Sequence, residues 1–395
     1  MSDKAPIFVC GPVRSPIGKF GGGLSSLMPA DLSVPVATAA LAAAGAQPEQ
    51  VDETIWGHGR QAGGGPNTAR QVSIRAGIPK ESTAYTVNKA CGSSLFAIVQ
   101  AARTIRLGEG EVILAGGVES MSNTPYLLPR ARWGYRMGHA ELVDGMYQDG
   151  FFCPLSNQLM GLTAETLAEQ YDISRDEQDA YAVESQRRAG SAWDEGAFSA
   201  EVVPIEVPGR KGPTVVDRDE HMRPTTTVDK LAKLKPVFKD DGSVHPGNSS
   251  GVTDGASAVV VASASAVERH GLRPIARVSA WQSAGVGPEV MGLGPVPATQ
   301  ALLERTGLTL SDIDLVELNE AFAAQVIACD RELHLDRDRL NVHGGSIALG
   351  HPIGATGCRI AVTLLHAMRR REAQRGLATL CISGGMGLSV LFDAA

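Results

Sequence analysis

The chain has 395 residues, with 36 Lys or Arg against 43 Asp or Glu, so its formal net charge is −7. Hydrophobic residues make up 43% and charged residues 20%, which excludes disordered and fibrous proteins, and at roughly 100–200 residues per domain we expect two or three domains. The mild acidity argues against a general nucleic-acid or anionic-membrane surface.

The N-terminal segment lacks the long apolar core of a signal peptide, and no stretch approaches the roughly 18 apolar residues that a membrane span needs. The six cysteines are scattered without a CxxC pair. This usage is typical of reduced proteins, in which each cysteine is a core residue or a nucleophile. We therefore expect a cytoplasmic protein with no membrane partner. The 45 glycines predict tight turns and close backbone approaches.

A pattern near the start of the chain returns much later. The helical segment 40–44 is followed by Gly45, by Asp52 and by a buried strand at 54–57. The segment 302–306 is followed by Gly307, Asp314 and a strand at 316–319, so the offset is 262 residues in both cases (307 − 45 and 314 − 52). Each copy predicts a helix ended by a glycine, a short loop and a buried strand.

A second pair of matching segments follows in the same order. Residues 112–117 and 378–385 each predict an apolar strand that runs into a pair of glycines. Two matched blocks in one order indicate a duplication. Strands that alternate with helices in each half predict two α/β units, each with a covered sheet.

The region from about Ser120 to Asn248 differs from both halves, because it is richer in Arg, Pro, Tyr and Asp. It contains one predicted helix near Thr163 and another that opens at Ser174, with Glu177 completing a capping box. We interpret the region as an insertion that covers a site or binds substrate. The expected domains are an N-terminal half (1–120 with about 249–275), an inserted loop domain (121–248) and a C-terminal half (276–395).

Cys91 follows a strand-like segment and precedes Gly92 and a segment of helical periodicity that carries Leu95 and Ile98. It would therefore lie close to a helix N-terminus, where backbone N–H groups and the helix dipole stabilise a thiolate. A buried cysteine at the start of a core helix is the alternative. The strand–Cys–Gly–Ser–Ser–helix context favours the nucleophile.

His351 stands between Gly350 and Pro352, in a glycine-rich turn before an amphipathic helix. Phosphate-binding loops are also glycine-rich, but this spacing is neither a Walker A nor a GxGxxG pattern, and no Lys follows. A histidine on a rigid turn is better interpreted as a base presented into a cleft than as a surface loop residue.

Two further polar groups stand at predicted strand ends. Cys381 precedes a glycine turn whose backbone N–H groups can hold an oxyanion, although its local pattern also fits a core residue. Asn319 follows the strand 315–318, and ligands bind beyond the carboxyl ends of such strands. Two thiols, an imidazole and an amide suit acyl transfer through a thioester. No HExxH, DxDxDG or paired-cysteine set occurs, so we expect no metal.

With these residues the chain resembles the thiolases, which comprise acetyl-CoA acetyltransferases and 3-ketoacyl-CoA thiolases, and the resemblance runs essentially from end to end. The motifs that carry it are Arg14-Ser-Pro-Ile-Gly18, Gln61-Ala-Gly, Asn67-Thr-Ala-Arg-Gln71, Asn88-Lys-Ala-Cys91-Gly-Ser, Gly116-Gly-Val-Glu-Ser-Met121, Ser174-Arg-Asp-Glu-Gln178, Gly247-Asn-Ser-Ser-Gly251, Asn319-Glu-Ala-Phe322, Gly350-His351-Pro-Ile-Gly354 and Cys381-Ile-Ser-Gly-Gly-Met386. The resemblance implies an α/β fold of two βαβαβαββ units in a five-layered αβαβα core with an inserted loop domain, usually in homodimers or homotetramers.

The resemblance also implies roles for individual residues. Cys91 would be the acylated nucleophile, His351 would take its proton, and Cys381 would be the second acid/base. His351 and a water held by Asn319 would form one oxyanion hole, and the backbone N–H groups of Cys91 and Ser383 the other. Each such hole is typically worth a few kcal/mol.

Coenzyme A thioesters are the implied substrates, with no covalently bound cofactor and no nucleic-acid partner. The residues implied to contact them are Ser250, Arg223, Leu234, Phe238 and Phe322 in the coenzyme A site and Met160 and Met291 near the acyl end. Two positions depart from the family pattern. Leu159 stands where acetoacetyl-CoA thiolases often carry a histidine, which argues against short-chain specialisation, and Ser383 stands where glycine is common.

The implied function is reversible cleavage of 3-ketoacyl-CoA by CoA, as in β-oxidation, or the condensation of two acetyl-CoA molecules. One alternative is a ketoacyl synthase, but those enzymes use His/His or His/Asn in place of the second cysteine, and Cys381 argues against it. The other alternative is a thiolase-like acyl-CoA or sterol-carrier binding protein. Such a protein would have lost Cys91 or His351, and both are present.

Overall fold

The computed structural model describes residues 5–395 and contains two α/β units with the same strand order. In the first unit the order is β1-β12-β5-β3-β4, and in the second it is β13-β16-β15-β14. Parallel strands lie to one side of antiparallel ones in both units: β5, β3 and β4 in the first, and β15 and β14 in the second. In the second unit a single parallel bridge between Val316 and Leu340 takes the place of β4. The strands are β1 (Ile7–Arg14), β3 (Glu53–His58), β4 (Thr83–Val87), β5 (Val112–Ser120), β12 (Thr253–Ser263), β13 (Pro274–Gly285), β14 (Leu315–Leu318), β15 (Arg375–Ile382) and β16 (Met386–Ala394).

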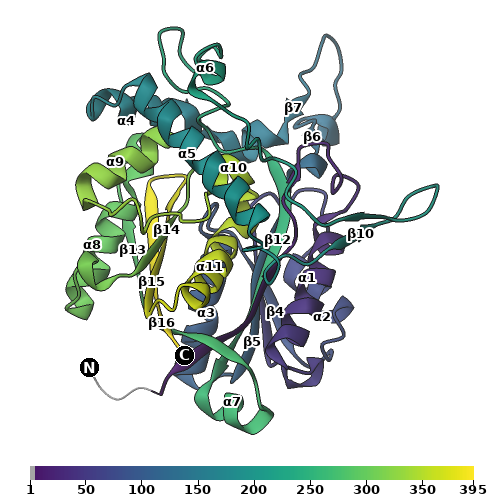
Figure 1. Ribbon diagram of the computed structural model, residues 1–395. Coiled ribbons are helices and arrows are strands. Elements are labelled where there is room, and N and C mark those ends of the chain that lie inside the picture. The colour runs from purple at the N-terminus through teal and green to yellow at the C-terminus, as the bar shows by residue number, and fades with distance from the viewer. Residues whose placement is uncertain (1–4) are drawn as a thin grey trace.

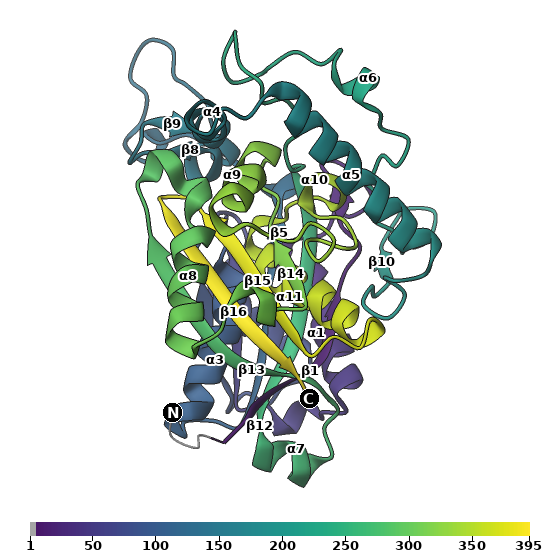
Figure 2. The ribbon, with the colours of Figure 1, turned by 60° about the vertical axis from the view of Figure 1, so that its left-hand side comes forward.

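Helices occupy three layers around these strands (Figures 1 and 2). One outer layer holds α1 (Pro29–Ala44) and α2 (Thr68–Arg75), and the other holds α8 (Pro295–Thr306) and α9 (Ala323–Leu333). Between the two units lie α3 (Ser93–Leu107) and α11 (Ile353–Arg370), which pack against each other and against strands of both units. The predicted αβαβα core is therefore confirmed.

Alternation along the strands explains the layering. On β5, Ile113 faces the central helices and Leu114 faces α1, because successive strand residues point to opposite sides. Both sides of each sheet are covered, so both sets of residues are apolar. The structure adds one feature that the sequence did not predict: β1 and β13 pair antiparallel, so that the two sheets join at one edge, with Phe8 opposite Arg277.

The first sequence repeat is confirmed by backbone and side-chain geometry. Gly45 ends α1 with φ 76° and Gly307 ends α8 with φ 69°, the left-handed conformation that favours glycine. The carboxylate of Asp52 accepts the N–H groups of residues 111 and 112 at 2.7 and 2.9 Å. The carboxylate of Asp314 accepts those of residues 374 and 375 at 2.8 and 2.9 Å. Asp52 thus holds the start of β5 in place by hydrogen bonds, and Asp314 does the same for the start of β15.

The second repeat was predicted with the wrong register. Gly384 and Gly385 form the turn between β15 and β16, but Gly116 and Gly117 lie inside β5. A Cβ on Gly117 would lie 2.3 Å from the carbonyl oxygen of Gly354 in α11. The glycine pair in β5 therefore serves a close helix–strand approach, whereas the pair after β15 serves a turn, and the strands match although their glycines do not.

The chain between β5 and β12 lies over the end of the core from which the central helices start (Figure 1). Its regular elements are β6 (Tyr126–Leu127), β7 (Val143–Asp144), β8 (Phe152–Cys153), β9 (Gln158–Leu159), α4 (Met160–Gln170), α5 (Arg175–Asp194), β10 (Ile205–Val207), β11 (Thr214–Val216) and α6 (Val228–Leu231). The predicted capping box is present, with Ser174 and Glu177 bonding each other's backbone N–H. The domain boundaries given above stay a prediction. Across residues 5–395, no helix combines the length and apolarity that crossing a bilayer requires.

The insertion is held to the first unit by buried charges. Arg14 at the end of β1 is fully buried, with Nε 2.6 Å from Glu201 and Nη1 2.7 Å from Asp219. Burial works against the charge of Arg14, but the two carboxylates outweigh it and raise its pKa. Breaking such a pair leaves a buried charge without a partner, which typically costs about 3–5 kcal/mol. The Arg14 motif is therefore the anchor between β1 and the segment that covers the core.

Candidate active site

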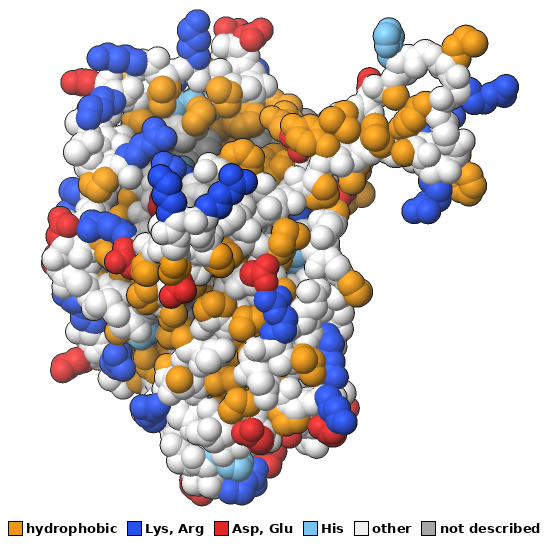
Figure 3. Space-filling view, turned by 90° about the vertical axis from the view of Figure 1, so that its right-hand side faces the viewer, with side chains coloured by type: hydrophobic (Ala, Val, Ile, Leu, Met, Phe, Trp, Pro, Cys, Tyr) orange, Lys and Arg blue, Asp and Glu red, His pale blue; other side chains and the backbone are white. Residues whose placement is uncertain are grey.

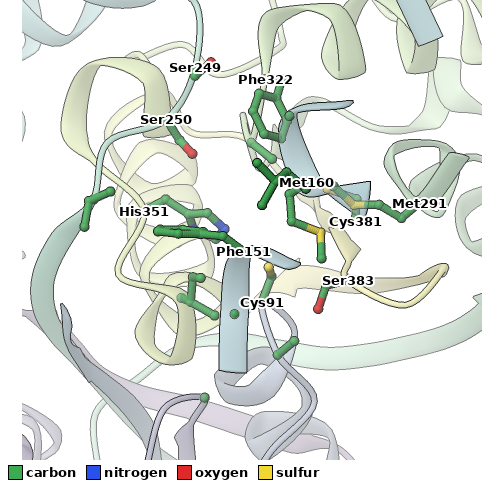
Figure 4. A pocket seen from close by; sticks show the side chains of 18 of the residues that line it. Cys91, Phe151, Met160, Ser249, Ser250, Met291, Phe322, His351, Cys381 and Ser383 are labelled. Atoms are coloured by element: carbon green, nitrogen blue, oxygen red, sulfur yellow. The ribbon is translucent and has the colours of Figure 1, made fainter. Parts of the chain in front are cut away.

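A cavity of about 280 Å³ lies where both units meet the insertion. Most of the residues implied by the resemblance line it: Cys91, His351, Cys381, Ser383, Ser250, Phe238, Met160, Met291 and Phe322. Figure 4 shows Cys91, His351 and Cys381 converging on one space, with Ser249 and Ser250 toward the opposite end of the view. Asn319 lies behind the lining, and Arg223 and Leu234 are exposed residues of the insertion that do not line the cavity.

Cys91 stands on a tight turn between β4 and α3. Ala90, the residue before it, has φ 44°, a left-handed conformation that is uncommon for a residue with a Cβ and costs about 1 kcal/mol. Two side chains hold the turn: Asn88 Oδ1 accepts the N–H of Ala90 at 3.0 Å, and Ser93 Oγ donates to the Ala90 carbonyl at 2.6 Å. The predicted strand–turn–helix position of Cys91 is therefore present, and the turn is strained and held in place.

Gly92 brings this turn against the second unit. A Cβ at Gly92 would lie 2.6 Å from Cδ1 of Ile382, the last residue of β15. Because Cys381 precedes Ile382, the missing side chain at Gly92 is what allows the two cysteines to share a cavity.

Cys91 is half-buried as a residue, and burial is the main influence on the pKa of its thiol. Burial raises the pKa of Cys91, while the backbone N–H of Ser383, the guanidinium of Arg60 and its own N–H act to lower it. The net shift is upward, so the free protein keeps Cys91 as a neutral thiol near pH 7. Nucleophilic attack therefore requires a base.

His351 is oriented to supply that base. Its Nδ1 lies 2.6 Å from Thr356 Oγ1, and that hydroxyl donates to the carbonyl of Pro352 at 3.0 Å. A hydroxyl has one hydrogen, so Nδ1 must be the donor in the imidazole–hydroxyl bond, and Nε2 keeps its lone pair. Burial, with smaller contributions from Arg359 and Arg60, lowers the pKa of His351 to about 3. The imidazole is therefore neutral and can accept a proton.

Cys381 and Ser383 lie where β15 ends. Cys381 is fully buried beside Met291 and Phe322, and burial, together with the nearby Cys91 and Cys329, raises its pKa well above the usual value for a thiol. Gly384 and Gly385 take the left-handed conformation, with φ 87° and 86°, but Ser383 does not. The serine at this position is thus accommodated without strain, and its backbone N–H remains available to an oxygen or sulfur.

Asn319 is the start of a hydrogen-bond chain behind the cavity. Its Oδ1 accepts from Ser346 Oγ at 2.6 Å, and Ser346 Oγ in turn accepts from Arg359 Nη2 at 2.9 Å. The Asn319 amide is therefore fixed with its Nδ2 group away from Ser346. Nδ2 is buried and has no hydrogen-bond partner, which suits an amide that holds a water.

Sequence reasoning missed residues that hold the site together. Glu119, on β5, accepts N–H groups of Gly59, Arg60 and Gly354 at 3.2, 3.0 and 2.9 Å and so joins three segments at the cavity wall. Its motif was noted, but a glutamate inside a strand carries no local signal for such a role. Arg60 and Phe151 also line the cavity, and neither stands in a pattern that would have identified it. Among residues 5–395, no group of three His, Cys, Asp or Glu side chains could hold a metal.

Comparisons with known proteins agree with this geometry. Residues 7–265 match the family model for the N-terminal domain of thiolase, and residues 272–394 match that for its C-terminal domain. An acetyl-CoA acetyltransferase of Pseudomonas aeruginosa is 50% identical over 385 residues, which cover 97% of this chain and 98% of that protein. The acetyl-CoA acetyltransferase of Escherichia coli is 47% identical over 382 residues, 96% of this chain and 97% of that protein.

Solved structures match over the same extent. The acetyl-CoA acetyltransferase of Bacillus anthracis superposes with a TM-score of 0.97 at 44% identity and covers 99% of both chains. Human mitochondrial 3-ketoacyl-CoA thiolase in complex with CoA superposes with a TM-score of 0.96 at 44% identity, covering 99% of this chain and 98% of that one.

Proposed function

This chain belongs to the thiolase family and is an acyltransferase that acts on CoA thioesters, and we propose that it works through an acyl group carried on Cys91. The observation that supports this most is the convergence of Cys91, His351 and Cys381, from three different elements, on one cavity. The similarity to proteins named acetyl-CoA acetyltransferase does not favour either alternative, the ketoacyl synthase or the binding protein.

In the cleavage direction, Nε2 of His351 takes the proton of Cys91 as the sulfur attacks the 3-keto carbon. The bond between C2 and C3 then breaks. The acyl group stays on the Cys91 sulfur, and the electron pair of the broken bond goes to C2, which leaves as the enolate of acetyl-CoA. Cys381 gives its proton to that enolate and is later reprotonated. CoA then attacks the acyl-Cys91 thioester and gives its thiol proton to the Cys381 thiolate. His351 returns the proton it took in the first step to Cys91, which leaves as the thiol.

Two negative oxygens develop during these steps. The backbone N–H groups of Cys91 and Ser383 would stabilise the oxygen of the group attached to Cys91. His351 and a water on Asn319 would stabilise the enolate oxygen. Because fixed donors act in a site shielded from bulk water, such contacts are typically worth a few kcal/mol each.

Substrate binding follows the same cavity. Ser250, Phe238 and Phe322 line the part through which the pantetheine would pass, and Met160 and Met291 lie beside Cys381. Arg223 and Leu234, exposed on the insertion, would meet the adenosine end, where phosphates need cations. Leu159 lines the cavity with an apolar side chain, where acetoacetyl-CoA thiolases often carry a polar histidine, so we propose acyl chains longer than four carbons and the degradative direction.

We also propose that the protein works in the cytoplasm as a homodimer or homotetramer. All six cysteines are free thiols, which suits a reducing compartment. The connection between β6 and β7 projects as an arm with exposed hydrophobic side chains (Figure 3). Trp133 is 86% and Met137 97% exposed on it, and apolar side chains gathered in this way mark a contact with another subunit.

The test is a thiolysis assay with acetoacetyl-CoA and longer 3-ketoacyl-CoA substrates, joined to mass spectrometry of the quenched protein. We expect CoA-dependent cleavage and an acyl group on the peptide that contains Cys91. Cys91→Ser should abolish both and leave the melting temperature within a few degrees. Normal turnover by Cys91→Ser would overturn the mechanism, and a strong preference for the four-carbon substrate would overturn the proposal for Leu159.

A further inference from the structure

Arg60 is a buried cation in the wall of the catalytic cavity that has almost no partner. Arg60 comes two residues after the end of β3. Its side chain is only 5% exposed and lines the same cavity as Cys91. Of its side-chain nitrogens, Nε is buried without a hydrogen-bond partner, and Nη2 has only the Met146 carbonyl, at 3.5 Å. Within residues 5–395, no carboxylate oxygen lies within 4 Å of its guanidinium.

The acidic groups nearest to Arg60 are used otherwise or stay apart from it. Glu119 accepts three backbone N–H groups and lies 3.4 Å from His58. Burial lowers the pKa of Arg60, and the charges of Asp149 and Asp144, both in the covering segment, offset this only in part. Asp149 lines the cavity as well, but neither carboxylate lies within 4 Å of the guanidinium. An unpaired buried charge is costly, because the solvation it loses is not replaced. Around Arg60 the protein supplies few hydrogen bonds or ion pairs to replace the lost solvation.

What the protein does supply is a shaped site around the guanidinium. The Phe151 ring lies 4.8 Å from the Arg60 Cζ, in a cation–π contact. A Cβ on Gly150 would lie 1.9 Å from Arg60 Nη2, so the backbone of the covering segment closes directly over the cation. That segment, Tyr147–Phe151, is a π-helix, a rare form found mostly at functional sites.

The position of Arg60 relative to the nucleophile gives its role. Cys91, Phe151 and Met146 belong to one apolar cluster, and Arg60 touches both Phe151 and Met146. Ser249 and Ser250 lie toward the other end of the cavity (Figure 4). An acyl group on Cys91, with the pantetheine entering past the two serines, would therefore extend toward Arg60. The cation also contributes to lowering the pKa of Cys91, although no Arg60 nitrogen hydrogen-bonds the sulfur.

We propose, resting on the function proposed above, that Arg60 is an anion subsite for the far end of the acyl group. The substrates would be 3-ketoacyl-CoA thioesters whose acyl chain ends in a carboxylate. The planar guanidinium can pair with both carboxylate oxygens, and the methylene groups would lie along the apolar wall. The carboxylate takes no part in bond changes, so cleavage yields acetyl-CoA and a carboxyacyl-CoA that is two carbons shorter.

The test uses two substrates of equal chain length, one ending in a carboxylate and one in a methyl group. For the unmodified protein we expect kcat/KM to be about 10-fold or more higher for the carboxylated substrate, the range of a charged hydrogen-bonded pair. The readout is the ratio of the two kcat/KM values, because any effect of Arg60 on Cys91 changes both and cancels. A ratio of one or less in the unmodified protein overturns the proposal without any variant.

Arg60→Met should lower that ratio about 10- to 100-fold, and Arg60→Lys should lower it less, because the charge stays and the bidentate geometry is lost. Arg106→Met, on the exposed end of α3, is the matched control and should leave the ratio unchanged. An equal loss on both substrates in Arg60→Met would mean that Arg60 acts on Cys91 or on the fold, and would overturn the subsite. Failure of the unmodified protein on every 3-ketoacyl-CoA would instead contradict the thiolase mechanism.

Discussion

Thr356 and His351, five residues apart, are joined by a bond of 2.6 Å between Oγ1 and Nδ1 that sets which imidazole nitrogen can act as a base. The threonine lies in the first turn of α11 and its hydroxyl also bonds the Pro352 carbonyl. The helix start therefore fixes both the position and the tautomer of the imidazole.

Removing the Thr356 hydroxyl should reduce the rate without removing the base. Thr356→Val leaves Nδ1 without its acceptor, so the population with a free Nε2 lone pair falls and the ring is held less firmly. We expect kcat for thiolysis to fall about 10- to 100-fold, with KM little changed. Thr356→Ser keeps the hydroxyl and should recover most of the rate. Equal rates for the valine and serine variants would contradict the positioning role.

The reactivity of Cys91 toward iodoacetamide should rise with pH beyond the ordinary range of a thiol. The thiolate is the reactive form, and burial raises the pKa of Cys91. Alkylation of the free protein should therefore be slow at pH 7 and keep increasing above the usual pKa of cysteine. Mass spectrometry of the alkylated peptide measures this, with Cys91→Ala as the control. Fast, pH-independent alkylation between pH 6 and 8, about where thiols are normally protonated, would show instead that Cys91 is a resting thiolate.

Cys381 should be separable from the acylation step. Cys381→Ala removes the acid/base near the enolate but leaves Cys91, His351 and the Ser383 N–H in place. We expect acetyl-CoA still to acylate Cys91, while exchange of deuterium into the acetyl methyl group falls by about 100-fold or more. Proton NMR follows the exchange, and intact mass follows the acyl-enzyme. Unchanged exchange in Cys381→Ala would assign the proton transfer to another group.

The Ser346 hydroxyl should support the amide of Asn319. Ser346→Ala removes the donor to Asn319 Oδ1, so the amide can rotate and its Nδ2 group loses its fixed direction. We expect thiolysis to slow about 10-fold or more, and Asn319→Ala to slow it about 100-fold, the usual cost of an oxyanion-hole donor. The double variant should lose no more than Asn319→Ala alone, because both changes act on one group. Additive losses would mean that Ser346 acts elsewhere.

The arm between β6 and β7 should control assembly and not chemistry. Trp133→Ser with Met137→Ser removes two exposed apolar side chains of the arm. We expect a smaller oligomer by sedimentation velocity and less than about a threefold change in kcat, because neither residue lines the cavity. Val215→Ser, at an exposed apolar position on the β10–β11 hairpin, is the control. An unchanged sedimentation coefficient would exclude the arm from the subunit interface.

Local patterns were enough to place Cys91 and His351, because each stands where a turn meets the start of a helix. The same was true of Gly45 and Gly307, whose left-handed backbone is a property of single residues. Patterns of this kind are encoded within a few neighbours, so they can be interpreted without the fold.

Contacts between distant segments could not be predicted in the same way. The register of the glycines in β5 is set by α11, more than 230 residues later, through the approach of Gly117 to Gly354. Arg60 is buried only because Gly150 and Phe151 close over it, and an isolated arginine in a loop usually predicts an exposed side chain. Asn319 was predicted at the right strand end, but its indirect position behind the cavity depends on Ser346 and Arg359.

The two central helices start side by side yet come from different repeats, with Cys91 before α3 and His351 before α11. Each repeat on its own carries half of the proton-transfer pair, so the reaction exists only after the two repeats have docked. The rate at which activity recovers during refolding therefore reports the docking of the two repeats. Activity should return later than the helical circular-dichroism signal. A substitution where α3 packs against α11, such as at Gly357, which contacts Leu95, would abolish activity although it changes no catalytic group.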